Sequence, residues 1–193
     1  MKKLLMIVLA GGILMACNNT VEEQYDDNVP TEIEAVAGVS METAVADIEG
    51  KSDMDVSGTV AFTEADGMVT MEANIIGLPK GKHAIHIHET GDCSAVDGKS
   101  AGGHWNPTGV DHGQWRMEPH HAGDIGNLES PGDSITVLSL TTDKWCLSCD
   151  DENKNILNKA IIIHAGPDDF TSQPSGAAGA RVGCGVIDKD EIM

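Results

Sequence analysis

Hydrophobic and polar residues alternate along much of this chain from Thr43 onward. Residues 56–75, VSGTVAFTEADGMVTMEANI, contain two alternating runs separated by Asp66 and Gly67. Alternation with a period of two is typical of a β-strand with one buried face, and an Asp-Gly pair favours a tight turn between two strands. The pattern therefore predicts a β-hairpin in this region.

Four further segments have the composition of short strands: LPKGKHAIHIHE at 78–89, DSITVLSLTTD at 133–143, KAIIIHAG at 159–166 and RVGCGVI at 181–187. Long connections rich in Gly, Asn and His separate them, and no ten-residue helical pattern lies between them. Short strands joined by long loops predict an all-β sandwich or barrel whose loops carry the function.

The composition and net charge of the chain limit which molecules it can be expected to bind. The chain has 22 glycines, 3% aromatic residues and a formal charge of −19. A nucleic-acid backbone requires a basic surface, so the charge excludes nucleic acid as an expected partner. The same charge repels any anionic substrate unless a positive group acts locally.

The chain begins with MKKLLMIVLAGGILMAC, two lysines followed by an apolar run too short to span a bilayer. This pattern predicts an export signal at 1–17, and its ending resembles a bacterial lipoprotein signal, with Cys17 as the lipidated residue. An ordinary signal peptide that ends in Cys is the alternative. Residues 18–41 are acidic and aperiodic, which predicts a flexible tether, and 42–193 form the expected domain. We expect a membrane-anchored protein facing the periplasm or the cell exterior.

Three of the eight histidines lie between 83 and 88. In a strand, His86 and His88 share one face and Ile85 and Ile87 share the other. His83 points to the opposite side from His86. The geometry predicts that His86 and His88 converge on one metal ion while the isoleucines fill the interior.

A second group of metal-binding residue types follows in 101–127, which is too rich in Gly, Pro and Asn for regular structure to be expected. It contains His104, His112, His121 and Asp124. Zinc, which takes imidazole nitrogens and a carboxylate oxygen in a closed tetrahedron, would hold such a loop together. His164 ends the KAIIIH strand at 159–164, on the face opposite to its isoleucines at 161 and 163.

Five segments resemble, in order, the copper/zinc superoxide dismutases, and most closely their bacterial secreted branch: HAIHIHETGDCS, GGHWNPTGVDHG, HHAGDIGN, IIIHAGPDD and GARVGCGVI. The resemblance covers roughly 43–188. It implies an eight-stranded Greek-key β-sandwich or barrel and the conversion of superoxide to oxygen and hydrogen peroxide.

The resemblance also implies the ligands of two metal ions. Copper would be bound by His86, His88, His104 and His164, and zinc by His104, His112, His121 and Asp124. His104 would bridge both ions and carry a proton to the product. Open imidazole coordination suits a redox copper, and a closed set with a carboxylate suits a structural zinc.

Two further residues match the family. Asp168 would link one ligand imidazole of each metal, with an ordinary acidic loop residue as the alternative. Arg181, one of only two arginines, would attract superoxide beside the copper, with a plain surface arginine as the alternative. No lysine lies between His164 and Arg181, unlike the eukaryotic pattern, so Lys82 or Lys99 could contribute to steering, or steering could be weaker. We expect His83 to be a packed structural residue and His120 to be a solvated surface residue.

Four cysteines remain after Cys17. Cys93 and Cys184 match the family's disulfide. Cys146 and Cys149 lie outside the family pattern, and we expect a short second disulfide, with a metal site or a thioredoxin-like redox pair as alternatives.

Two other functions compete with the dismutase. A copper-buffering lipoprotein on the same scaffold would keep the ligands and lose turnover, and it would need neither Arg181 nor a bridging His104. A zinc hydrolase would require an open coordination position, which this ligand set fills. Motifs leave the choice between monomer and homodimer open.

Overall fold

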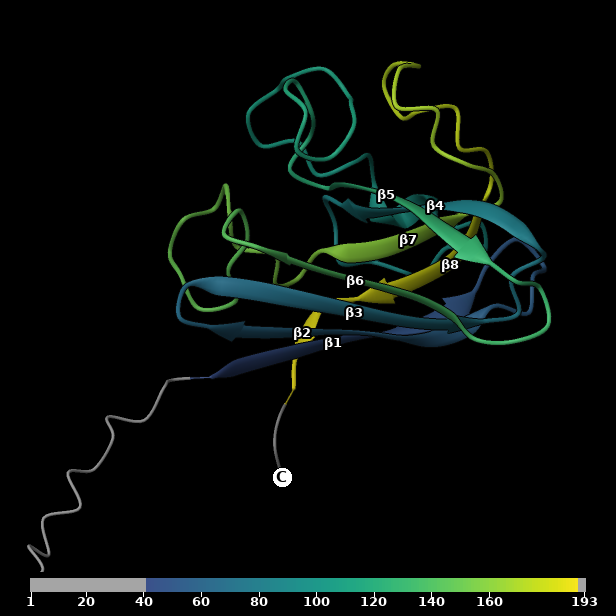
Figure 1. The fold of residues 1–193 in the computed structure, drawn as a ribbon, viewed down its shortest axis with the longest axis horizontal. Coiled ribbons are helices and arrows are strands. Elements are labelled where there is room, and N and C mark those ends of the chain that lie inside the picture. The colour runs from purple at the N-terminus through teal and green to yellow at the C-terminus, as the bar shows by residue number, and fades with distance from the viewer. Residues whose placement is uncertain (1–40, 191–193) are drawn as a thin grey trace, which may run out of the picture. The chain divides into compact units, whose positions relative to one another are not determined.

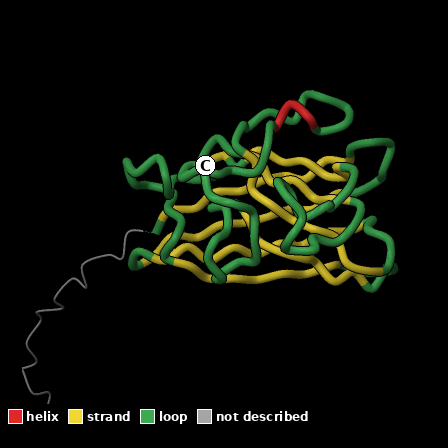
Figure 2. Tube along the Cα trace, turned by 90° about the horizontal axis from the view of Figure 1, so that it is seen from above, coloured by secondary structure: helices red, strands yellow, loops and turns green. Residues whose placement is uncertain are grey.

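The computed structural model describes residues 41–190, so the predicted export signal at 1–17 with Cys17, and all of the predicted tether except Met41, lie outside the described residues. The described part is almost entirely β-structure (Figures 1 and 2). Its one helical element is a single 3₁₀ turn, η1 (Lys99–Ala101), and it contains no helix long and apolar enough to cross a membrane.

Nine strands make up the sheet: β1 Glu42–Gly50, β2 Ser57–Ala65, β3 Met68–Ile76, β4 Gly81–His88, β5 Asp124–Ser130, β6 Thr136–Thr142, β7 Ala160–His164, β8 Arg181–Val186 and β9 Asp188–Lys189. Eight of them follow the order β5-β4-β7-β8-β1-β2-β3-β6, all antiparallel, and β9 pairs with β1. β4 lies beside β7 and β3 beside β6, so long connections pass between the two halves in Greek-key fashion. The predicted all-β, eight-stranded Greek-key barrel is confirmed.

The predicted hairpin is also confirmed. β2 and β3 pair from Ser57 opposite Ile76 to Ala65 opposite Met68. Asp66 and Gly67 have φ angles of 52° and 72°. Positive φ at both central residues is the requirement of a tight turn that matches the twist of the strands.

One face of each strand from β1 to β8 packs into the core that fills the barrel. Ile85 and Ile87 of β4 are fully buried in it, together with Ile161 and Ile163 of β7 and Phe62 of β2. The alternation predicted for β4 therefore holds, and its histidines at 86 and 88 lie on the other face.

One prediction about regular structure is wrong. The composition of 101–127 predicts an irregular loop that includes 124–127, but Asp124 begins β5, which pairs with β4 from Gly81 to His86. The register shifts between Ile85 and His86, so the pairing contains a bulge that a period-two pattern does not reveal. Backbone pairing to β4, rather than side-chain propensity, places this Gly- and Asn-containing segment in the sheet.

Three connections are long: 89–123 between β4 and β5, 143–159 between β6 and β7, and 165–180 between β7 and β8. In Figure 1 the first and the third rise on the same side of the barrel, next to β4, β5 and β7. Both therefore lie over the face of the sheet that carries His86 and His88.

Candidate metal centre

Two groups of side chains meet on the outer face of β4. Within each group, one possible ligand atom from every residue lies within 4.8 Å of those of all the others. One group is His86, His88, His104 and His164, and the other is His104, His112, His121 and Asp124. The structure thus brings together all seven predicted ligands, and His104 belongs to both groups.

The strands position the first group. His86 and His88 are alternate residues of β4, and His164 ends β7, which pairs with β4. His104 forms an isolated antiparallel bridge with His88. These rings point away from the barrel interior, yet His86 is 0% and His88 1% exposed. Connections 89–123 and 165–180 cover them, so an outward-facing ring here is not a solvent-exposed ring.

In each ring of the first group, one nitrogen lies at hydrogen-bonding distance from an oxygen of another residue. Nδ1 of His88 lies 2.9 Å from Gly102 O, and Nδ1 of His164 lies 3.3 Å from Gly179 O. Nε2 of His86 donates to Asp168 Oδ2 at 2.8 Å.

The other nitrogen of each ring in this group is buried and has no hydrogen-bond partner: His86 Nδ1, His88 Nε2, His104 Nε2 and His164 Nε2. Buried polar atoms without partners are rare in proteins. Four imidazole nitrogens that meet at one point form the ligand set of a copper ion. The residues therefore fit copper on their own geometry.

Asp124 organises the second group. Its carboxylate oxygens lie 2.8 Å from His104 Nδ1, 3.0 Å from His112 Nδ1 and 3.3 Å from His121 Nδ1. It also accepts hydrogen bonds from the backbone N–H groups of Gly113 and His121. These contacts hold the pKa of the Asp124 carboxyl far below its usual range despite its burial. Three imidazole nitrogens and a permanently ionised carboxylate match a closed zinc site.

Burial also affects the first group. Desolvation lowers the pKa of His164 to about 4, and it lowers the pKa values of His86 and His88 well below the ordinary value. Neutral imidazole is the form that coordinates a metal ion. The fold therefore keeps these rings ready to bind at neutral pH.

Asp168 connects the two groups, as its matched position in the family implies. While Oδ2 accepts from His86, Oδ1 accepts from His112 Nε2 at 2.9 Å. A Cβ atom on Gly176, whose φ is 65°, would collide with Asp168 Oδ1 and crowd His112 Nε2. Only glycine therefore fits at position 176, where the 165–180 connection folds back over the Asp168 carboxylate.

Asn127 supports the site although no sequence motif singles it out. Its side-chain amide donates to Asp168 O at 3.0 Å and accepts from Asp168 N at 2.8 Å. Asn127 lies on β5 and is separated from Asp168 by 41 residues, so no local pattern could have linked them. The amide fixes the backbone of the residue that joins both groups.

Arg181 lies at a cavity of about 560 Å³ that opens onto the first group. Its guanidinium donates to Gly98 O at 2.8 Å and to Gly102 O at 2.7 Å, so it is fixed in place. His88, His104 and His164 also line this cavity. Lys82 and Lys99, the alternative sources of steering, do not line it and instead form exposed ion pairs with Glu129 and Asp97.

The two histidines outside both groups differ from one another. His83 is 5% exposed, and its ring nitrogens lie 3.1 Å from His164 O and 2.9 Å from Pro79 O. It is a packed structural residue, as expected.

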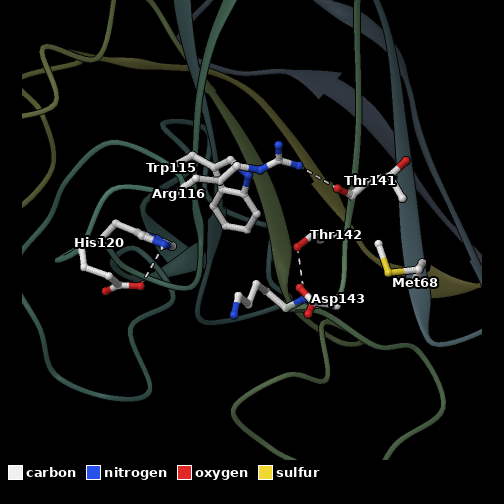
Figure 3. A pocket seen from close by; sticks show the side chains of 9 residues that line it. Met68, Trp115, Arg116, His120, Thr141, Thr142 and Asp143 are labelled. Carbon is white, nitrogen blue, oxygen red and sulfur yellow. Dashed lines mark hydrogen bonds and ion pairs between the residues drawn. The ribbon is translucent and has the colours of Figure 1, made fainter.

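The expectation that His120 is solvated is wrong, because its side chain is only 9% exposed. Its ring lies 5.1 Å from that of Trp115 and its Nδ1 lies 2.7 Å from His121 O. Figure 3 shows Trp115 and His120 beside Arg116, where they line a separate cavity with residues at the end of β6. Packing against Trp115, which the sequence pattern did not reveal, covers the imidazole.

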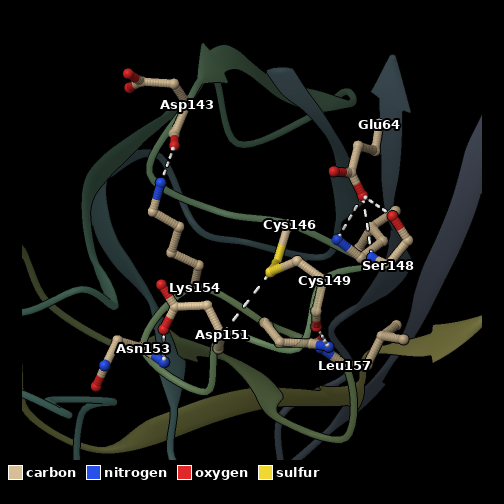
Figure 4. The surroundings of a disulfide bond; sticks show 11 residues. Glu64, Asp143, Cys146, Ser148, Cys149, Asp151, Asn153, Lys154 and Leu157 are labelled. Atoms are coloured by element: carbon tan, nitrogen blue, oxygen red, sulfur yellow. Dashed lines mark hydrogen bonds between the residues drawn. A yellow bond between two sulfur atoms is a disulfide. The ribbon is translucent and has the colours of Figure 1, made fainter. Parts of the chain in front are cut away.

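Residues 41–190 contain two disulfides, Cys93–Cys184 and Cys146–Cys149. The first joins the connection after β4 to β8. The second closes a short turn whose backbone N–H groups at Leu147 and Ser148 donate to Glu64 Oε2 (Figure 4). Neither pair is then free to coordinate a metal ion.

A family model described as "Copper/zinc superoxide dismutase (SODC)" matches residues 56–187, more than half of the chain. The match spans all seven residues of the two groups, together with Asp168 and Arg181. Copper and zinc are the metals that this family uses, and the donor atoms described above fit both. The chain belongs to the copper/zinc superoxide dismutase family.

Proposed function

We propose that this protein catalyses the dismutation of superoxide, and that His104 is shared between copper and zinc. The observation that carries the proposal is the position of that ring. Its Nδ1 lies 2.8 Å from Asp124 in the second group, and its buried Nε2 has no partner and belongs to the first group. One imidazole would thus supply a nitrogen to each metal when both are bound.

Copper, when bound, supplies the one-electron oxidation and reduction that convert two superoxide anions and two protons into oxygen and hydrogen peroxide. Arg181 attracts the anion and positions it in the cavity beside His88, His104 and His164. Its two hydrogen bonds to loop carbonyls keep the guanidinium there without reorganisation when the anion arrives.

His104 transfers one of the two protons to the product. Nδ1 stays directed toward Asp124, which keeps the ring orientation, while Nε2 takes up a proton and donates it to the departing product. Asp168 serves a separate purpose, because its bonds to His86 and His112 fix the tautomers of both rings.

The charge of the chain shapes substrate capture. A formal charge of −19 repels superoxide at long range, and Arg181 is the only lysine or arginine among the described residues that line the cavity. Attraction therefore acts over a short distance, within the cavity mouth.

The proposed location is a membrane surface facing the periplasm or the cell exterior, with a lipid anchor at Cys17. The lysine-led apolar leader that ends in Leu-Met-Ala-Cys supports this proposal. Metabolic labelling with a radioactive fatty acid in a bacterial host, compared with Cys17→Ala, tests it. Sedimentation of the purified protein decides between monomer and homodimer.

The function is tested by loading the purified protein with copper and zinc and measuring superoxide removal by pulse radiolysis. His104→Ala is the informative variant, and His120→Ala removes a histidine of the same loop that belongs to neither group. We expect turnover in the wild type and in His120→Ala, and a large loss in His104→Ala. Normal turnover in His104→Ala would reject the shared ring. Tight copper binding without turnover in the wild type would favour a copper-buffering protein instead.

A further inference from the structure

Gln173 makes two hydrogen bonds to a single residue of the second metal group. Its Oε1 accepts from His112 N at 2.9 Å, and its Nε2 donates to His112 O at 2.9 Å. The two residues are 61 positions apart, in different long connections. A side-chain amide thus replaces the backbone partners that His112 lacks in an irregular segment.

The ring of His112 is held at the same time from the same connection. Asp168 accepts from Nε2, and this leaves Nδ1 directed at Asp124, 3.0 Å away. Within 165–180, therefore, one residue fixes the ring of His112 and another fixes its backbone. Together they define where Nδ1 lies.

Gln173 also lines the cavity that contains Arg181 and the first group. The segment around it is folded on itself, since Gly176 N donates to Ser172 O and Asp169 N donates to Gly176 O. The amide of Gln173 is thus a direct contact between the second metal group and the wall of the cavity.

We propose that Gln173 is a positioning residue of the zinc group and that it couples zinc binding to the order of the cavity wall at 169–176. Zinc at the second group would fix His112, and His112 would hold Gln173 and its neighbours in place. Because such coupling is reciprocal, an ordered wall also strengthens zinc binding. The inference rests on the assignment of zinc to this group and does not require that the protein turn over superoxide.

Gln173→Ala removes both hydrogen bonds, and Gln114→Ala is the matched control. Gln114 lies in the other connection, two residues from His112, is exposed, and its side chain makes no hydrogen bond in the described structure. The dissociation constants of Zn²⁺ and Cu²⁺ are measured for the metal-free proteins by competition with a chromophoric chelator. Hydrogen–deuterium exchange of the 169–176 amides is followed with and without zinc.

For Gln173→Ala we expect the zinc dissociation constant to rise about five- to tenfold, as the loss of two partly exposed hydrogen bonds implies. The copper constant and the melting temperature of the metal-free protein should match those of the wild type. Zinc should slow exchange at 169–176 in the wild type and in Gln114→Ala, and much less in Gln173→Ala.

Two results would overturn the inference. One is a zinc constant in Gln173→Ala within twofold of the wild-type value. The other is an equal weakening of zinc and copper binding together with a lower melting temperature, which would make Gln173 a residue that only stabilises the fold. A protein without dismutase activity would reject the proposed function and leave these binding measurements intact.

Discussion

The carboxylate of Asp168 accepts a hydrogen bond from Nε2 of His86 at 2.8 Å, and both side chains are completely buried. Its second oxygen serves His112 in the zinc group. Asp168→Asn replaces one acceptor oxygen by an N–H donor, so one of the two rings loses its partner. Loss of such a partner commonly weakens metal binding 10- to 100-fold, and we expect about that loss for zinc or copper, measured by chelator competition.

Asp133→Asn is the control for that variant, because Asp133 is exposed and its side chain makes no hydrogen bond in the described structure. It makes the same change of charge and should bind both metals as the wild type does. Unchanged affinities in Asp168→Asn would show that the rings keep their orientation without this carboxylate.

Arg181 and Arg116 form a natural pair for testing substrate attraction, since they are the two arginines of the chain. Arg181→Ala should lower kcat/KM for superoxide about tenfold, because it removes the positive charge at the cavity. Arg116→Ala changes the net charge equally, but Arg116 lines a different cavity, where it donates to Thr141 O. Pulse radiolysis should show Arg116→Ala near the wild-type rate, and equal losses in both variants would mean that net charge alone governs capture.

The two disulfides should differ in their effect on stability. Cys93 and Cys184 are 91 positions apart, whereas Cys146 and Cys149 are 3 apart. In the chain-entropy model, closing the larger loop raises the free energy of unfolding by roughly 4–5 kcal/mol, and closing the smaller loop raises it by about 2 kcal/mol. Urea unfolding of the two double Cys→Ser variants measures both free energies, and a larger loss from the Cys146 and Cys149 pair would contradict this order.

The metal-free protein should lose stability as the pH falls from about 6.5 to about 4. Burial lowers the folded-state pKa values of His86, His88 and His164, so the unfolded chain binds more protons in this window. Each such histidine adds a slope of about 1.4 kcal/mol per pH unit.

His112 acts in the opposite direction, because its raised pKa contributes stability below 6.5 that is lost as the pH rises through the folded-state pKa. Burial also lowers the pKa of His121, so four rings oppose one, and the net free energy of unfolding should decrease toward acid pH. Urea titrations of the metal-free protein at pH 7, 5.5 and 4.5 measure it. A flat profile would mean that the buried rings gain protons without opening the site.

The sequence reveals the parts of this site that depend on local geometry. Alternation along a strand places His86 and His88 on one face and Ile85 and Ile87 on the other, and the structure agrees. Asp66 and Gly67 likewise identify their own turn through the φ values that they adopt. Such features depend on residues that are neighbours in the chain, so a short sequence pattern is enough to predict them.

Features that depend on tertiary contacts leave no local pattern in the sequence. Asp124 lies in β5 only because that segment pairs with β4. Trp115 covers His120 from nearby in the chain, but the irregular backbone between them has no repeating pattern that predicts the contact. The amides of Asn127 and Gln173 act on residues 41 and 61 positions away. Nothing in the local composition of these segments distinguishes such amides from ordinary loop residues.

The two-sided character of β4 links metal retention to correct folding. If β4 shifted its register by one residue against β7, its isoleucines would face the metal-binding loops and its histidines would enter the hydrophobic core. A chain with the slipped register would present its ligands to neither ion. Binding of the ions therefore favours the native register, and metal that stays bound through purification indicates that β4 and β7 are correctly paired.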